Sequence, residues 1–369
     1  MRTVLTDLLG IRYPIVQTGM GYVSGAHLTA ATAKAGGLGV IGSATMSPDQ
    51  LEASIRTVQE RTDAPFGVNL RADADDAAER VDLIIRYGVR VASFALAPRK
   101  ELVQRLKDAG VVTMPSVGAR RHAEKVAGWG ADLVVVQGAE GGGHTGPVPT
   151  SLLLPQVVDA VDIPVVAAGG YFDGRGLVAA LAYGAAGIAM GTRFLLTSDS
   201  PVADAVKRIY LASDVTGTLV TSRADGVPHR LLRTPLVERL DRAGAAGRLS
   251  GVVRSARSAS AFRRASGQTW PELIREGRAM RRGSGLTWGQ VLMAANTPVL
   301  LRAAMADGRP EAGLMPAGQV TGLIDDLPSC AELIARIMTE AEERLSSMAA
   351  VTGQPQPTAA NAVSDQDSS

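Results

Sequence analysis

Short runs of β-branched and other apolar residues alternate with amphipathic helical segments through the first 195 residues. Eight apolar runs occupy residues 14–19, 38–43, 66–70, 89–95, 111–117, 133–138, 165–170 and 187–192. Segments of helical composition lie between them at residues 47–61, 75–87, 99–109, 120–129, 155–161 and 175–183. Because eight strands alternate with helices at a spacing of about 25 residues, the pattern predicts an α/β fold, a (β/α)8 TIM barrel. A doubly wound open sheet usually has fewer consecutive units.

The pattern changes near residue 206. Residues 239–282 contain eleven Arg and three acidic residues, a local charge of +8, although the whole chain carries only +2. We interpret residues 206–287 as a helical, Arg-rich cap inserted after strand eight. Residues 1–205 and 288–350 then form the barrel, which an amphipathic helix at 329–348 closes. The tail at 351–369 is rich in Gln, Pro, Ala and Ser, a composition typical of disorder.

The composition of the chain excludes several classes of protein. The chain has 369 residues, of which 46% are hydrophobic and 20% charged, as in soluble globular proteins. The single cysteine, Cys330, excludes a disulfide scaffold, a Cys-rich zinc site and an iron–sulfur cluster, and we expect no metal. The N-terminus lacks the apolar core of a signal peptide, and no apolar run approaches the length of a membrane span. We therefore expect a cytoplasmic protein without a membrane partner.

Glycine is unusually frequent, with 41 residues, and its placement is informative. Gly169 and Gly170 end the seventh apolar run, and Met190, Gly191 and Thr192 end the eighth. In TIM barrels these neighbouring strand ends commonly bind phosphate through backbone N–H groups that small residues leave accessible. Two glycine tips in tandem therefore favour a phosphate site over glycines that merely shorten loops.

Two segments match G-x-G-x-x-G, at residues 37–42 and 141–146. A dinucleotide-binding fingerprint must follow a strand and open a helix. The first match lies inside a predicted strand, and the second runs into Pro147-Val148-Pro149. The pattern thus argues against a Rossmann site.

The second match follows strand six and ends in a histidine. Residues 137–146 read Gln-Gly-Ala-Glu-Gly-Gly-Gly-His-Thr-Gly, and three consecutive glycines let a ligand approach the backbone. Imidazole suits proton transfer near neutral pH, so His144 is the candidate catalytic residue. We interpret His27, His122 and His229 as structural or surface residues, and Cys330 as a buried, inert thiol.

Together these segments resemble the nitronate monooxygenase (2-nitropropane dioxygenase-like) family of FMN enzymes, which also includes flavin-dependent enoyl reductases. The resemblance extends over about residues 3–345, with its segments in the family's expected order. The segments that carry it are Pro14–Met20, Gly67–Asn69, the loop ending in His144, Ala168–Gly170, Met190–Thr192 and Ala317–Gln319. The family's loop usually reads Glu-Ala-Gly-Gly-His, whereas this chain has glycine at position 141, a departure that puts strict nitronate chemistry in doubt.

The resemblance implies a barrel that holds FMN, with His144 as the acid–base residue. It implies that Gly19, Met20, Asn69 and Gln137 lie near the flavin, and that the tips of strands seven and eight bind its phosphate. The full set of expected cofactor-binding residues is Gly19, Met20, Asn69, Gln137, Gly143, Gly169, Gly170, Met190, Gly191 and Thr192.

Segments 141–147, 171–176, 194–200 and 288–298 look closest to one branch of the family, which acts on a bulky acyl-CoA from steroid C/D-ring breakdown. We therefore expect an FMN-dependent oxidoreductase that introduces a C=C bond α,β to the thioester, with hydride transfer to flavin. Arginine binds phosphate bidentately, so the basic segment suits a CoA substrate, although a solvated surface explains it equally well. Arg230 and Arg233 are candidate substrate-binding residues.

Other functions remain open on the sequence. They are a nitronate monooxygenase using O2, an NAD(P)H-dependent enoyl reductase, and a flavin-binding barrel without turnover. Nucleic acid is not an expected partner, because the basic segment has only Phe262 and Trp270 to stack on bases. The sequence does not decide whether the chain forms a homo-oligomer.

Overall fold

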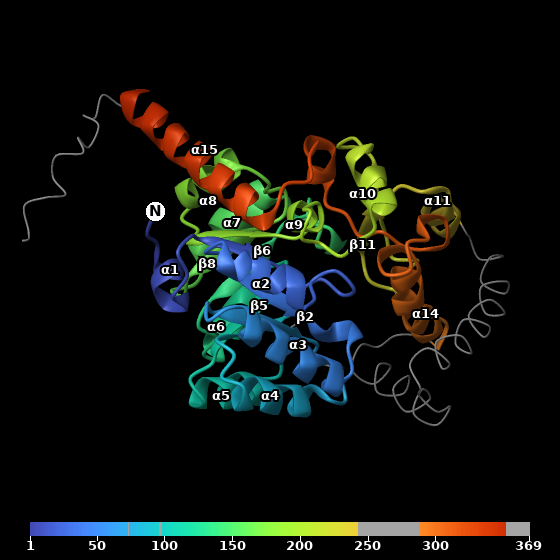
Figure 1. The fold of residues 1–369 in the computed structure, drawn as a ribbon, viewed down its shortest axis with the longest axis horizontal. Coiled ribbons are helices and arrows are strands. Elements are labelled where there is room, and N and C mark those ends of the chain that lie inside the picture. Colours follow the sequence, from blue (N-terminus) through green and yellow to red (C-terminus); the bar gives the residue numbers. More distant parts are fainter. Residues whose placement is uncertain (73, 96–97, 243–287, 352–369) are drawn as a thin grey trace, which may run out of the picture.

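The computed structural model describes residues 1–369 except 73, 96–97, 243–287 and 352–369 (Figure 1). Eight parallel strands close into a barrel, each pairing with the next and the last with the first. They are β1 (Ile15–Gln17), β2 (Leu38–Gly42), β3 (Phe66–Leu70), β4 (Val91–Phe94), β5 (Val112–Val117), β6 (Val134–Gln137), β8 (Val165–Ala168) and β9 (Gly187–Met190). The predicted TIM barrel is confirmed, because each expected apolar run contains one of these strands.

Helices surround the barrel, and most follow the predicted alternation. They are α2 (Ala26–Lys34), α3 (Pro48–Arg61), α4 (Ala77–Arg86), α5 (Lys100–Asp108), α6 (Arg120–Gly128), α7 (Thr150–Val158) and α8 (Gly174–Ala182), after a short α1 (Val4–Leu9). The last helix, α15 (Cys330–Val351), packs against α8 and α2 and closes the ring, as predicted. No described helix is long and apolar enough to cross a membrane.

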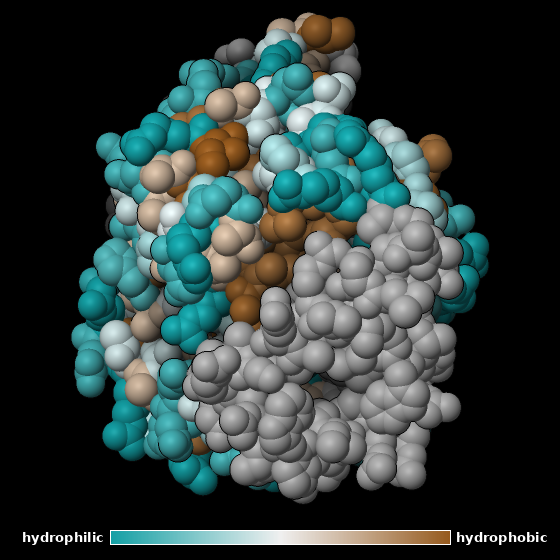
Figure 2. All heavy atoms as spheres, turned by 90° about the vertical axis from the view of Figure 1, so that its right-hand side faces the viewer, coloured by the Kyte–Doolittle hydropathy of each residue, from teal (hydrophilic) through white to brown (hydrophobic). Residues whose placement is uncertain are grey.

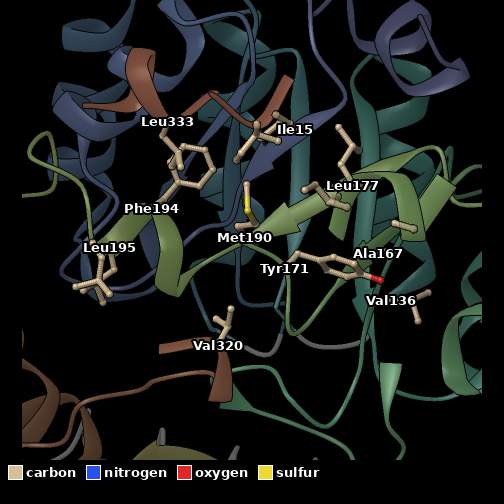
Figure 3. Packing of buried hydrophobic residues seen from close by; sticks show 14 of the residues in the cluster. Ile15, Val136, Ala167, Tyr171, Leu177, Met190, Phe194, Leu195, Val320 and Leu333 are labelled. Carbon is tan, nitrogen blue, oxygen red and sulfur yellow. The ribbon is translucent and has the colours of Figure 1, made fainter. Parts of the chain in front are cut away.

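Both faces of the barrel strands are buried, which explains why the apolar runs are nearly continuous rather than alternating. The helix α3 begins with a capping box: Gln50 N–H donates to Ser47 Oγ, and Ser47 N–H donates to Gln50 Oε1. At the other side of the barrel, Phe194 packs beside Leu333 of α15, which ties the tip of β9 to the closing helix (Figure 3).

The helix α7 begins at Thr150, five residues before the predicted start at 155. Its first turn buries Leu153 and Leu154 in the core. The carboxylate of Glu140 accepts a hydrogen bond from the Thr150 N–H and so satisfies one free donor of the helix start. This cap comes from ten residues upstream, outside the local window that signals a helix start.

The segment after β9 contains strands as well as helices. It holds α9 (Thr192–Leu195), α10 (Asp204–Leu211), β10 (Thr218–Thr221), β11 (His229–Leu232) and α11 (Pro235–Arg242). The two strands pair antiparallel, and β11 also pairs with β7 (Gly143–His144), so the sheet order is β10-β11-β7. The predicted cap is therefore not wholly helical: the β-branched residues of Thr218–Thr221 form a strand that pairs with β11, and β11 in turn pairs with the glycine loop at β7.

The elements α10, α11 and α14 (Trp288–Met305) lie together on one side of the molecule, beside β11 (Figure 1). This face is largely hydrophilic, with an apolar area next to the residues drawn in grey (Figure 2). Most of the Arg-rich stretch at 239–282 and the tail at 352–369 lie outside the described residues, so the structure does not test those expectations.

Candidate active site at the carboxyl ends of the strands

The carboxyl ends of all parallel barrel strands meet at one end of the barrel, and the tips of β1, β3 and β9 contact one another there. A Cβ added to Gly19 would lie 2.3 Å from Asn69 Cβ, so only glycine fits where the chain after β1 passes the tip of β3. A Cβ added to Gly191 would lie 3.2 Å from Thr18 Oγ1 and 3.5 Å from Met20 Sδ. Four of the predicted cofactor residues are thus neighbours.

The tip of β8 has a backbone that requires glycine. Gly169 and Gly170 have φ angles of +97° and +88°, in the region that favours glycine. A Cβ at Gly170 would meet only the Glu140 side chain, at 3.6 Å, so this backbone is open. Among the described residues, the N–H groups of Gly170 and Gly191 donate to no protein acceptor.

The glycine loop after β6 is held by hydrogen bonds at both ends. The amide of Gln137 donates to the backbone carbonyl of His144 at 2.8 Å. Thr150 Oγ1 lies 2.7 Å from Glu140 Oε2 and 2.9 Å from the Gly169 carbonyl, so it joins this loop to the tip of β8. The loop is therefore a fixed part of the site.

Only one of the three consecutive glycines in this loop is needed for its backbone conformation. Gly143 has φ +76° and open space where a side chain would be. At Gly141 and Gly142 an added Cβ would lie 2.6 Å from Gln137 Nε2 and 2.6 Å from Gly318 N. At these two positions glycine is required because protein atoms lie where a side chain would be.

The segment around Gly318 connects three parts of the site. Its N–H donates to Thr192 Oγ1 at 2.9 Å, and the neighbouring Gln319 N–H donates to the Glu140 carbonyl at 3.0 Å. Close by, β11 pairs with residues 315–317. The tip of β9, the glycine loop and β11 are thereby held together by one late stretch of chain.

His144 ends the loop in β7, and its side chain is 45% exposed. Its Nε2 lies 2.7 Å from Asp225 Oδ2, a short hydrogen bond between residues 81 positions apart. Across the antiparallel pair, His229 is its direct partner, with ring centroids 4.6 Å apart. His144, the predicted catalytic residue, thus contacts a buried carboxylate and a buried imidazole.

Asp225 lies in the connection between β10 and β11 and is only 8% exposed. Its Oδ1 accepts a hydrogen bond from the Val227 N–H at 3.1 Å. Burial by itself would raise the pKa of Asp225, but the hydrogen bond from His144 and the nearness of His229 outweigh it and hold that pKa well below its usual value. The carboxylate is therefore ionised at neutral pH.

His229 is 3% exposed, and among the described residues neither ring nitrogen has a hydrogen-bond partner. Its Nδ1 lies 3.5 Å from Asp225 Oδ2 without hydrogen-bond geometry. Burial lowers the pKa of His229, and the opposing effect of Asp225 is smaller. His229 is therefore neutral at physiological pH.

The sequence interpretation missed Asp225 and took His229 as a structural or surface residue. The available signal was local: an Asp and a His four residues apart, around Gly226 and Pro228. It was weak, because nothing nearby indicates that this turn pairs with the glycine loop. The donor atoms of His144, Asp225 and His229 lie within 4.8 Å of one another, close enough to hold a metal ion, although no metal was expected from the sequence.

The two candidate substrate arginines have different surroundings. Arg230 is half-buried: its Nε donates to the Ala139 carbonyl at 3.0 Å and its Nη1 to Thr218 Oγ1 at 2.9 Å. It therefore braces the glycine loop against β10. Arg233 is 51% exposed and lies 3.7 Å from Glu238 of α11.

Cys330, at the start of α15, is fully buried. Burial raises the pKa of its thiol to about 12. Its thiol lies 3.6 Å from Thr32 Oγ1 on α2, within the packing of the closing helix. The expectation of a buried, inert cysteine is consistent with these surroundings.

The chain is similar to known proteins in both sequence and fold. The family model described as nitronate monooxygenase matches residues 2–340. The chain is 61% identical to the (3aS,4S,5R,7aS)-5-hydroxy-7a-methyl-1-oxo-octahydro-1H-indene-4-carboxyl-CoA dehydrogenase of Mycobacterium tuberculosis, over 95% of this chain and 99% of that protein. It is 57% identical to the dehydrogenase of the same name from Rhodococcus jostii, with the same coverage.

Among solved structures, FabK from Thermotoga maritima is similar, with a TM-score of 0.77 and 33% identity. The match covers 95% of this chain and 99% of FabK. The similarity in sequence and in fold thus extends over nearly the whole chain. The chain belongs to the nitronate monooxygenase family.

Proposed function

We propose that this protein is an FMN-dependent oxidoreductase that introduces a C=C bond α,β to the thioester of a bulky acyl-CoA. The substrate class follows from relatives named as dehydrogenases of a hydroxylated methyl-oxo-octahydroindene-carboxyl-CoA. The observation that carries the proposal is His144, half-exposed at the active end of the barrel and hydrogen-bonded to a buried carboxylate.

The residues at the strand tips suit the phosphate of FMN. Gly170 and Gly191 have backbone N–H groups without a protein acceptor among the described residues, and no side chain covers Gly170 closely. In this proposal these groups hold the phosphate, while Gly19, Met20, Asn69 and Gln137 lie along the ring. When bound, FMN supplies an acceptor for the hydride and its electron pair.

His144 has the role of the base. The thioester carbonyl acidifies the proton on the α carbon, and an unprotonated ring nitrogen of His144 takes this proton as the Cα–H bond breaks. The β carbon loses its hydrogen as hydride, and the electron pair left on the α carbon forms the Cα=Cβ bond. The nearby Asp225 carboxylate stabilises the imidazolium that results.

The basic segment of the chain suits the CoA part of the substrate. Arg233, exposed beside α11, and the Arg-rich stretch at 239–282 offer guanidinium groups for the pyrophosphate and the ribose phosphate. Arg230 contributes mainly by bracing the loop that carries His144.

The test is anaerobic reduction of the purified yellow protein in a stopped-flow instrument. We expect rapid bleaching of the flavin absorbance by a bulky, steroid-derived acyl-CoA, and little bleaching by the corresponding free acid. Faster bleaching by an alkyl nitronate would overturn the proposal in favour of nitronate oxidation. Faster bleaching by NADH or NADPH alone would favour an enoyl reductase.

The role of His144 has its own test. The change His144→Ala should lower the rate of flavin reduction at saturating acyl-CoA by about 10²- to 10⁴-fold, the usual contribution of a general base. Flavin content should be unchanged. A variant that reduces its flavin at the wild-type rate would remove His144 from this role.

A further inference from the structure

We propose that Asp225 is a positioning residue, which fixes the proton of neutral His144 on Nε2 and thereby leaves Nδ1 as the base. The inference deepens the proposed function and rests on it, since it concerns the same histidine. Asp225 acts through His144 and does not itself touch the substrate.

The assignment follows from the hydrogen-bond inventory of the two groups. Ionised Asp225 has oxygen atoms that only accept, so the atom of His144 at 2.7 Å from Oδ2 must be the donor. That atom is Nε2. A neutral imidazole carries one ring proton, so Nδ1 then has a free lone pair, and among the described residues it has no protein partner.

The backbone holds this arrangement in place from both sides. The register of β7 and β11 sets His144 directly opposite His229, and the Thr145 N–H donates to the Pro228 carbonyl at 3.1 Å. Asp225 is fixed by the hydrogen bond from Val227 N–H to Oδ1, which leaves Oδ2 directed at His144. Neither side chain needs to reorient to make the contact.

His229 packs beside both members of the pair. Its ring centroid lies 4.6 Å from that of the His144 ring, its Nδ1 lies 3.5 Å from Asp225 Oδ2, and the residue is buried. The hydrogen bond from His144 to ionised Asp225 is charge-assisted, and such bonds are shorter and stronger than those between neutral groups.

The arrangement makes a specific prediction for Asp225→Asn. Val227 N–H still requires an acceptor, so the amide oxygen keeps the Oδ1 position and the amide NH2 faces His144. An N–H donor opposite Nε2 turns that nitrogen into an acceptor and moves the ring proton to Nδ1, where it blocks the base. The change Asp225→Ala removes the acceptor of the hydrogen bond from Nε2 but puts no donor in its place.

The experiment reads the tautomer by NMR in the flavin-loaded protein without substrate. The chain has four histidines, so ¹⁵N-histidine labelling gives few signals, and His144→Gln assigns the relevant pair. We expect the proton on Nε2 in the wild type and on Nδ1 in Asp225→Asn. Flavin reduction by acyl-CoA should fall by about 10²- to 10³-fold in Asp225→Asn and less in Asp225→Ala, with acyl-CoA affinity unchanged.

Asp214→Asn is the matched control, because the Asp214 carboxylate accepts hydrogen bonds from Thr216 and Gly217 of its own exposed turn. It should leave both the tautomer and the rate unchanged. If the NMR spectrum of the wild type places the His144 proton on Nδ1, that result alone overturns the assignment. An unchanged tautomer in Asp225→Asn would also overturn it. If the protein binds a divalent metal, and its removal by EDTA alters the His144 signals, Asp225 is a metal ligand. That outcome would also overturn the assignment.

The outcome is separable from that of the proposed function. If no acyl-CoA reduces the flavin but the tautomer shifts as described, the substrate is wrong and the positioning role stands. If acyl-CoA reduces the flavin and the tautomer does not shift, the reaction stands and the positioning role fails.

Discussion

His144 and His229 are direct cross-strand partners in the small sheet beside the barrel, with their rings tilted by 39° to each other. One ring is half-exposed, and the other is buried with its Nδ1 3.5 Å from the carboxylate that accepts from the first. The pair therefore combines a group that is able to exchange protons with solvent and one that is kept neutral.

Buried neutral His229 should make the protein sensitive to mild acid. Burial holds the pKa of His229 in the folded protein below its ordinary value of about 6.5, so the unfolded chain binds a proton before the folded one does. The free energy of unfolding should consequently fall as the pH drops below about 6.5. Urea unfolding at pH 7.5 and pH 5.5 measures this loss, which should be smaller in His229→Phe. The control is the exposed His27→Gln, and an equal loss in wild type and His229→Phe would contradict the prediction.

Gly170→Ala should weaken flavin binding through the backbone alone. A φ of +88° costs a non-glycine residue about 1–3 kcal/mol, and relief of this strain rotates the N–H that we assign to the phosphate. Loss of one such hydrogen bond corresponds to about 10- to 100-fold weaker FMN binding, measured by flavin fluorescence.

Gly10→Ala is the matched control for that variant. Gly10 ends α1 with φ +73° and has nothing within 4 Å of an added Cβ. It should show a similar loss of thermal stability with unchanged FMN affinity. Equal weakening of FMN binding in both variants would point to general destabilisation rather than a phosphate site at β8.

Thr150→Val should loosen the glycine loop. The hydroxyl joins Glu140 to the Gly169 carbonyl, and its removal takes the donor from this part-buried carbonyl, at a cost of about 1 kcal/mol, while Glu140 keeps its hydrogen bond from the Thr150 N–H. Thermal or urea unfolding measures the change. Thr57→Val, on an exposed face of α3, should change the stability by less than about 0.5 kcal/mol. Equal effects at the two sites would show that Thr150 has no special role.

Arg233→Met tests the contact with CoA phosphates. Since exposed ion pairs contribute little, the KM for the acyl-CoA should rise only about two- to fivefold, and the maximal rate of flavin reduction should stay the same. Arg120→Met removes one exposed arginine of α6 as a control. If the two variants have the same KM, Arg233 does not bind the substrate.

Much of the barrel was predictable because its signals are local. A parallel strand buried on both faces must be apolar throughout, so runs such as 133–138 and 165–170 identify strands directly. Their carboxyl ends necessarily meet at one end of the barrel, which is why Gly169, Gly170 and Gly191 were expected to be neighbours.

The expectations that failed depended on distant contacts. The start of α7 is capped by Glu140, ten positions earlier in the chain. The strands in the segment after β9 form because β11 pairs with the two residues of β7. A two-residue strand has no sequence pattern of its own.

The barrel, the glycine tips and a histidine on a loop at the active end could be predicted without coordinates, because each depends on residue type and on spacing along the chain. The residues that contact that histidine became visible only in the folded arrangement. Asp225 and His229 lie more than 80 residues later in the chain and reach His144 through the antiparallel pairing of β11 with β7. The register of β11 is set by its hydrogen bonds to β7 and to residues 315–317 rather than by any local preference.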